Sequence, residues 1–71
     1  MISKCQIILK LYDDATNNKV IKTQEYMYVY SISERTVRRY INELNCFFAD
    51  TYKYLELVYE KKLKGYILKK Y

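Results

Sequence analysis

The sequence predicts a small α+β domain in which three helices are followed by a two-stranded β-hairpin. Before residue 50, apolar residues recur at the three- and four-residue steps of amphipathic helices. After residue 54, two β-prone segments flank a basic connector, and the only glycine of the chain follows it directly. With 71 residues, the chain is expected to form one domain, residues 1–71, around a compact and simple core.

The first helix is predicted to begin near Ser3, which can act as its N-cap, and to end at about Asp14. One apolar stripe of this helix should face the core, and it comprises Cys5, Ile8, Leu11 or Tyr12, and Ala15, widened by Ile7 and Leu9. The segment DDATNN favours a turn, and a short extended piece should follow at Val20 and Ile21.

A second helix is expected from Thr23 to Val29, with Tyr26, Met27 and Tyr30 facing inward. A third helix, over about residues 33–48, has the strongest local signals. Ser33 stands at its N-cap position, where a side-chain oxygen accepts a hydrogen bond from a free backbone N–H of the first turn. Ile32 and Val37 form a hydrophobic staple at the start of this helix. Glu34 places a negative charge at the positive end of the helix dipole. A core stripe follows, made of Val37, Ile41, Leu44 and Phe48.

All three arginines of the chain lie in one five-residue stretch of the third helix, at Arg35, Arg38 and Arg39. Counted at about 100° per residue from the first core position, Arg35 lies at about 160°, Arg39 at about 200° and Asn42 at about 140°. These three residues therefore point away from the core together, with Thr36 and Arg38 on their flanks. Arginine binds guanine edges and phosphates in a bidentate way. This layout is that of a helix-turn-helix recognition helix, although a solvated face with arginines chosen for solubility would look the same.

The last part of the chain predicts a hairpin over about residues 55–69. Leu55 to Glu60 and Gly65 to Leu68 are β-prone, and Gly65 stands where the loop should need a residue with positive φ. Three lysines should lie at the tip, namely Lys61, Lys62 and Lys64. A hairpin in this position is a wing whose lysines can contact phosphates or the minor groove, and the alternative is an ordinary lysine-rich loop.

The composition argues against catalysis and against a bound cofactor or metal. The chain has no histidine, so the usual base at neutral pH is missing, and a single glycine cannot build a phosphate-cradling loop. Cys5 and Cys46 cannot fill a tetrahedral zinc site, and they are expected to be buried free thiols. No signal peptide or membrane span is evident. We therefore expect a cytoplasmic protein that is not an enzyme.

Ten tyrosines are the other unusual feature of the composition. Seven fall on or near core-facing positions, namely Tyr26, Tyr28, Tyr30, Tyr40, Tyr54, Tyr59 and Tyr66. The simpler interpretation is a tyrosine-rich core with hydroxyls at its rim. The alternative is a stacking platform for single-stranded nucleic acid, which would need several rings on one exposed sheet face beside a basic groove.

The order of these segments resembles the winged helix-turn-helix domain at the N-terminus of DeoR-type and WYL-type bacterial transcriptional regulators. The segment SISERTVRRYINELN matches the recognition-helix pattern at Ile32, Ser33, Thr36, Val37, Arg39, Ile41 and Leu44, and the wing pattern is matched at Gly65, Tyr66 and Leu68. Met27 replaces a small alanine of the family, and Ser31 stands at a turn position where glycine is frequent. No glycine follows the recognition helix, so residues 45–53 could prolong it. Larger family members carry an effector domain after the wing, so this chain either lacks that domain or is a fragment.

These features together predict sequence-specific binding of double-stranded DNA and regulation of transcription, by a dimer associated with the nucleoid. The net charge of +5 and the isoelectric point near 9.2 favour such a partner. Base contacts are expected from Arg35, Thr36, Arg39 and Asn42, phosphate contacts from Ser33 and Arg38, and wing contacts from Lys61, Lys62 and Lys64. The alternative is a winged-helix protein-interaction module that binds an acidic partner through the arginine face and the tyrosines.

Overall fold

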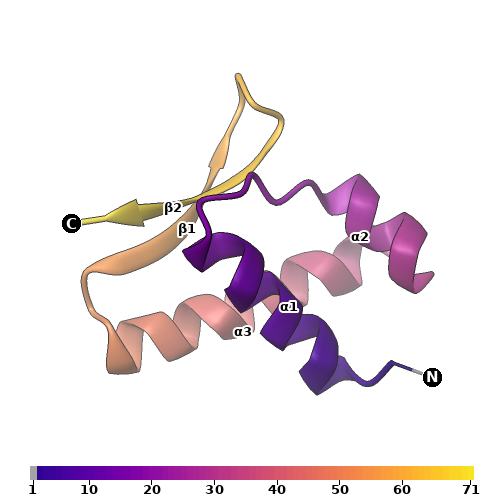
Figure 1. Ribbon diagram of the computed structural model, residues 1–71, viewed down its shortest axis with the longest axis horizontal. Helices are drawn as coiled ribbons and strands as arrows, with labels where there is room; N and C mark the ends of the chain where they lie inside the picture. The colour runs from indigo at the N-terminus through magenta and orange to yellow at the C-terminus, as the bar shows by residue number, and fades with distance from the viewer. Residues whose placement is uncertain (1) are drawn as a thin grey trace.

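The computed structural model describes residues 2–71, which form three helices followed by a two-stranded antiparallel hairpin (Figure 1). The elements are α1 (Lys4–Thr16), α2 (Thr23–Tyr30), α3 (Glu34–Thr51), β1 (Leu55–Glu60) and β2 (Gly65–Lys70). Helix α1 crosses α3, and α2 lies beside the N-terminal end of α3. The hairpin follows the other end of α3, and its tip turns back above the segment between α1 and α2. The α+β architecture predicted from the sequence is confirmed.

Helix α1 begins at its predicted cap. The Ser3 hydroxyl accepts a hydrogen bond from the Gln6 backbone N–H at 3.3 Å, and the Gln6 side-chain oxygen accepts one from the Ser3 N–H at 3.0 Å. This reciprocal arrangement is a capping box, which satisfies two backbone donors at once. The helix ends two residues later than predicted, at Thr16, so the turn is confined to Asn17 and Asn18.

The buried face of α1 matches the prediction in part. Ile7, Leu11 and Ala15 lie in the core as predicted. Cys5 and Leu9 are exposed and Ile8 is only half-buried, so the predicted stripe was wrong at these positions. The spacing of apolar residues could not show which side of α1 is buried, because α1 carries two adjacent apolar stripes and α3 covers only one of them. The expectation of buried thiols is also wrong, since Cys5 and Cys46 are both exposed.

The core is built around α3. Val37, Ile41, Leu44 and Phe48 are buried as predicted, each at most 3% exposed. They form one cluster with buried residues of the other elements, namely Ile7, Leu11, Ala15, Ile21, Tyr26 and Leu57. Helix α3 extends to Thr51, so residues after position 45 prolong it where the resembled family has a glycine.

Two hydrogen-bonded contacts fix the hairpin on the helices. The Asn45 side chain donates to the Leu57 carbonyl at 3.0 Å and accepts from the Leu57 N–H at 2.8 Å. Next to the hairpin loop, Ile21 and Tyr66 of β2 exchange backbone hydrogen bonds of 2.8 and 2.7 Å. The extended piece predicted at Ile21 thus adds an isolated bridge along β2.

The glycine of the hairpin has a different role from the predicted one. Lys64 takes the left-handed conformation, with φ of 54°, whereas Gly65 does not have a positive φ. A Cβ atom on Gly65 would lie 2.6 Å from Val20 Cγ1 and 2.8 Å from the Ile21 carbonyl oxygen. The glycine is therefore required by the close approach of two backbone segments rather than by the loop conformation.

The tyrosine-rich core is only partly present. Tyr26 is buried, whereas Tyr28 is 87% exposed and Tyr54 and Tyr59 are also exposed. The remaining members of the predicted set, Tyr30, Tyr40 and Tyr66, are half-buried and pack against the core. Tyr28 lies about 200° around α2 from the buried Tyr26, so its ring faces solvent. Tyr54 precedes β1 and Tyr59 lies near the end of β1, and both of these rings are exposed as well.

Candidate nucleic-acid interface

The N-terminal turn of α3 is held in place by its cap. The Ser33 hydroxyl accepts a hydrogen bond from the Thr36 N–H at 3.1 Å, and the two hydroxyl oxygens lie 2.9 Å apart. Ile32 packs against the core and Val37 is buried, as expected of a hydrophobic staple. Ser33 and Thr36, both predicted to contact DNA, therefore also contact each other, and Thr36 is half-buried.

The turn before α3 keeps a tight geometry without glycine. Ser31 ends α2 in the left-handed conformation, with φ of 53° and ψ of 48°, and its N–H donates to the Met27 carbonyl. The Ile32 N–H donates to the same carbonyl at 3.3 Å. The departures from the resembled family at Met27 and Ser31 thus leave a short connection between α2 and α3.

Helix α2 is tied to α1 by a charged cluster. The Tyr26 hydroxyl donates to the Asp14 carboxylate, which also forms ion pairs with Lys10 at 3.0 Å and Lys19 at 4.0 Å. Burial alone would raise the pKa of Asp14, but the hydrogen bonds and the lysine charges outweigh it, so this pKa is lowered. The pKa of Tyr26 is raised, first by burial and then by the hydrogen bond to Asp14. The cluster holds α2 in a defined position against α1.

The arginine face of α3, defined as Arg35, Arg39 and Asn42, is exposed along its whole length. These three residues line one shallow hollow of about 390 Å³ together with Glu34 and Arg38. Arg38 forms an ion pair with Glu34 at 2.8 Å, one turn earlier on the helix. Among the described residues, neither Arg35 nor Arg39 forms an ion pair. Two guanidinium groups therefore remain available to an external acceptor.

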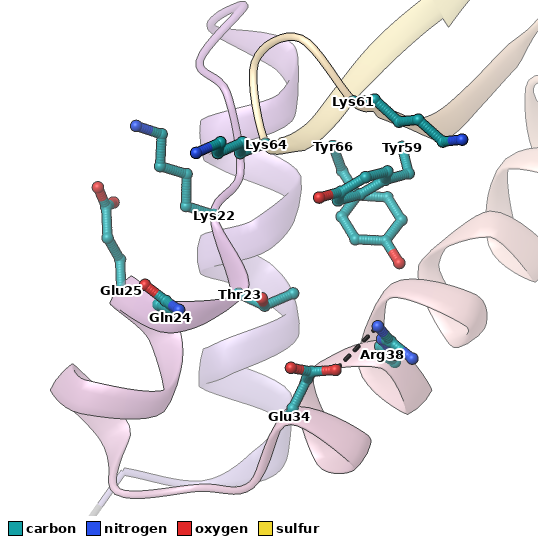
Figure 2. Close-up of a pocket in the computed structure, with 10 residues that line it drawn as sticks. All are labelled: Lys22, Thr23, Gln24, Glu25, Glu34, Arg38, Tyr59, Lys61, Lys64 and Tyr66. Atoms are coloured by element: carbon teal, nitrogen blue, oxygen red, sulfur yellow. Dashed lines mark ion pairs between the residues drawn. The ribbon is translucent and has the colours of Figure 1, made fainter.

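A second hollow, of about 660 Å³, lies between α2, the start of α3 and the hairpin loop (Figure 2). Figure 2 shows the Glu34–Arg38 pair on its α3 side and the rings of Tyr59 and Tyr66 near the hairpin. Its basic residues are Lys22, Arg38, Lys61 and Lys64, and the polar residues Thr23, Gln24 and Glu25 complete the lining. The rings of Tyr59 and Tyr66 meet edge to face, with centroids 5.4 Å apart.

Both hollows are bordered by Glu34 and Arg38, so they adjoin each other, and together they are called the concave surface. This surface joins the arginine face to two of the three predicted wing lysines, Lys61 and Lys64. Lys62 does not line either hollow, and its backbone N–H donates to the Glu60 carboxylate at 3.4 Å. The structure thus separates Lys62 from the other two lysines.

Sequence reasoning missed the contribution of the α2 end of this surface. Lys22 is the exposed N-cap residue of α2. Within residues 2–71 its ammonium group forms no ion pair, so the group is accessible to a ligand. The sequence shows a lysine one position before the predicted start of the second helix. It does not show that this lysine lies beside the hairpin loop, because that placement depends on the bridge between Ile21 and Tyr66.

Comparisons of this chain with protein-family models, curated proteins and solved structures found no match. No helix within residues 2–71 is long and apolar enough to cross a membrane. The same part of the chain contains no group of three or more cysteine, aspartate or glutamate side chains placed to hold a metal ion. The geometry of the concave surface is therefore the basis for any assignment of function.

Proposed function

We propose that this protein binds double-stranded DNA in a sequence-specific way and regulates transcription. The observation that supports this proposal best is the concave surface, whose two adjoining hollows are lined by the arginine face of α3 and by Lys61 and Lys64 of the hairpin loop. Such a surface offers two kinds of contact at once, namely base edges for the helix and backbone phosphates for the lysines. The likeness to winged helix-turn-helix regulators leads to the same proposal, which includes a place on the bacterial nucleoid.

Helix α3 has the dimensions and the side chains needed for the major groove. A helix with side chains is about 10–12 Å across, and the major groove of B-DNA is about 12 Å wide. Arg35 and Arg39 can each bind the O6 and N7 atoms of guanine, and Asn42 can bind the N6 and N7 atoms of adenine. Because Thr36 is half-buried against Ser33, its proposed base contact is restricted to its hydroxyl and methyl edge.

Phosphate contacts are assigned to the groups at the border of the base-reading face. Ser33 lies at the helix N-terminus, where free N–H groups and the helix dipole favour an anion. Arg38 is already paired with Glu34, so a phosphate must share this guanidinium or displace the carboxylate. Lys61 and Lys64 act as point charges on the neighbouring backbone, and Lys62 should contribute less because it lies outside the concave surface.

The base-reading role is tested by selecting a preferred site from a random duplex library with the wild-type protein and with single variants. Arg39→Ala should relax the preference at one or two base positions, because a bidentate contact discriminates by about 1–3 kcal/mol. Arg38→Ala should weaken all sequences alike. Lys53→Ala, which removes one positive charge beyond the C-terminal end of α3, is the control for a general loss of charge.

The role of the hairpin is tested by titrating binding with salt. The double variant Lys61→Ala with Lys64→Ala should reduce the slope of log K against log salt by up to about one unit for each phosphate that the variant no longer binds. Lys62→Ala is the matched control, from the same loop, and should change the slope less. An unchanged slope in the double variant would show that the loop does not touch DNA. A wild-type protein that enriches no motif and binds acidic proteins without a steep salt dependence would instead favour a protein-interaction module.

A further inference from the structure

Helix α1 carries an apolar stripe that the core does not use. Taking Leu11 as the centre of the buried face, Cys5, Ile8, Leu9 and Tyr12 occupy an adjacent sector about 100° wide. Leu9, at the outer edge of this sector and about 160° from Leu11, is 64% exposed. A helix with two apolar stripes is typical of a position between two packed layers, whereas α3 covers α1 from one side only. The second stripe is therefore a surface without a partner within the single chain.

This stripe forms one wall of an apolar groove, and α3 forms the other. The groove has a volume of about 440 Å³ and is lined by Ile8, Leu9, Tyr12, Glu43, Leu44 and Phe47. Phe47 is 45% exposed and meets the ring of Tyr12 edge to face at 6.4 Å between centroids. Tyr12 is half-buried, so the exposed apolar surface beside the groove comes mainly from Leu9 of α1 and Phe47 of α3.

The charge of the groove indicates which partner fits it. Its single charged lining residue, Glu43, is paired with Lys4 at 3.0 Å, so the face is close to neutral on a chain of net charge +5. An acidic partner would be attracted to the arginine face rather than to this groove. Two cationic copies, in contrast, repel each other least through a neutral apolar face, where Lys4 of each copy can also meet Glu43 of the other.

We propose that this groove is the contact surface between two copies of this chain, related by a two-fold axis. Leu9 and Phe47 of each copy enter the interface, and both are more than two-fifths exposed in the single chain. A stable interface takes about 800 Å² from each partner, of the 5319 Å² that this chain exposes. The proposed dimer does not depend on DNA binding, and it does not block the face proposed to bind DNA. Phe47 lies about 80° or more around α3 from each member of the arginine face, so both arginine faces stay accessible in the dimer.

The test is the mass of the protein in solution, measured by sedimentation equilibrium from about 1 µM to 1 mM. The wild type should approach twice its chain mass of 8.7 kDa, and Leu9→Glu should remain at the mass of one chain. Val29→Glu is the matched control, because Val29 is 65% exposed on α2, close to the 64% of Leu9. Circular dichroism of both variants shows whether each is folded. A wild type that stays at one chain mass, or a dimer that Val29→Glu dissociates and Leu9→Glu does not, would overturn the proposal.

The two exposed cysteines give a second measurement that needs no substitution. Cys5 lies in the unused stripe of α1, whereas Cys46 lies at about 180° on α3, within the arginine face. Alkylation of Cys5 should slow as the protein concentration rises, and alkylation of Cys46 should not. If the rate at Cys5 stayed constant while the mass rose from one chain to two, the interface would lie elsewhere and the proposal would be refuted.

Discussion

Replacing Gly65 with alanine should destabilise the protein, although its backbone conformation suits an L-amino acid. Gly65 does not have a positive φ, and at such positions Gly→Ala normally stabilises a protein by about 0.4–1 kcal/mol through the unfolded chain. Here the added Cβ would lie 2.6 Å from Val20 Cγ1 and 2.8 Å from the Ile21 carbonyl oxygen. Both distances are too short for a carbon contact, and the second one involves backbone.

The size of the destabilisation depends on which atoms must move to make room for the new methyl group. Overpacking a well-packed site costs about 1–3 kcal/mol. Relief at the carbonyl requires Ile21 to shift, and Ile21 exchanges hydrogen bonds of 2.8 and 2.7 Å with Tyr66. Each of these bonds contributes about 0.5–1.5 kcal/mol. If both bonds are lost, subtracting the usual gain from alanine leaves a fall in the free energy of unfolding of roughly 1–5.5 kcal/mol.

Urea denaturation of Gly65→Ala and of Lys64→Gly checks this prediction. Lys64 has φ of 54°, and a non-glycine residue in the left-handed region costs of order 1 kcal/mol. Lys64→Gly should therefore leave the free energy of unfolding unchanged or raise it slightly, because glycine relieves that strain but gains entropy when unfolded. The opposite pair of results would refute both steps of this reasoning. A stabilising Gly65→Ala would mean that Gly65 does not approach Ile21 closely, and a destabilising Lys64→Gly would mean that Lys64 is not strained by a left-handed conformation.

Three other perturbations test the packing that supports the concave surface. Leu44→Ala should cost about 2–5 kcal/mol in urea denaturation, and a loss well below 1 kcal/mol would mean that the α3 stripe faces solvent. Asn45→Ala leaves the Leu57 N–H and carbonyl without their side-chain partner, so it should cost about 1–3 kcal/mol and speed hydrogen exchange at Leu57. Because the folded pKa of Asp14 is lowered, its stabilisation is present above the unfolded pKa of about 3.9 and lost as pH falls through the folded value. Thermal melts should therefore show Asp14→Asn to be less stable than wild type at neutral pH, with a smaller difference below about pH 4.

The elements predicted best were those specified by neighbouring residues. The start of α3 depends on Ile32, Ser33 and Val37, which lie within six consecutive positions, and each acts as predicted. The exposed arginine face follows from the same periodicity, because a helix with one buried stripe must turn the opposite residues outward. Local signals thus sufficed for α3, for the bounds of α2 to within one residue and for the strands of the hairpin.

The features that failed depend on contacts between distant segments. The choice between the two stripes of α1 is made by α3, and nothing within α1 distinguishes Leu11 from Tyr12. The reason for Gly65 lies at Val20 and Ile21, more than forty positions earlier in the chain. Lys22 joins the candidate site for the same reason, because the bridge at Ile21 brings it beside the hairpin loop.

The two contacts that hold the hairpin also connect stability to the proposed function. Asn45 fixes β1 on α3 and Ile21 fixes β2 on the segment before α2, so together they set the position of Lys61 and Lys64 relative to Arg38. Asn45→Ala loosens the hairpin but leaves Arg35 and Arg39 unchanged on α3. It should therefore lower the affinity for every duplex while the selected motif stays the same, because backbone contacts carry no direct sequence information. Arg39→Ala should change the motif at unchanged stability. If Asn45→Ala changed the motif as well as the affinity, the hairpin would position α3 in the groove, and the division of roles between helix and hairpin would be wrong.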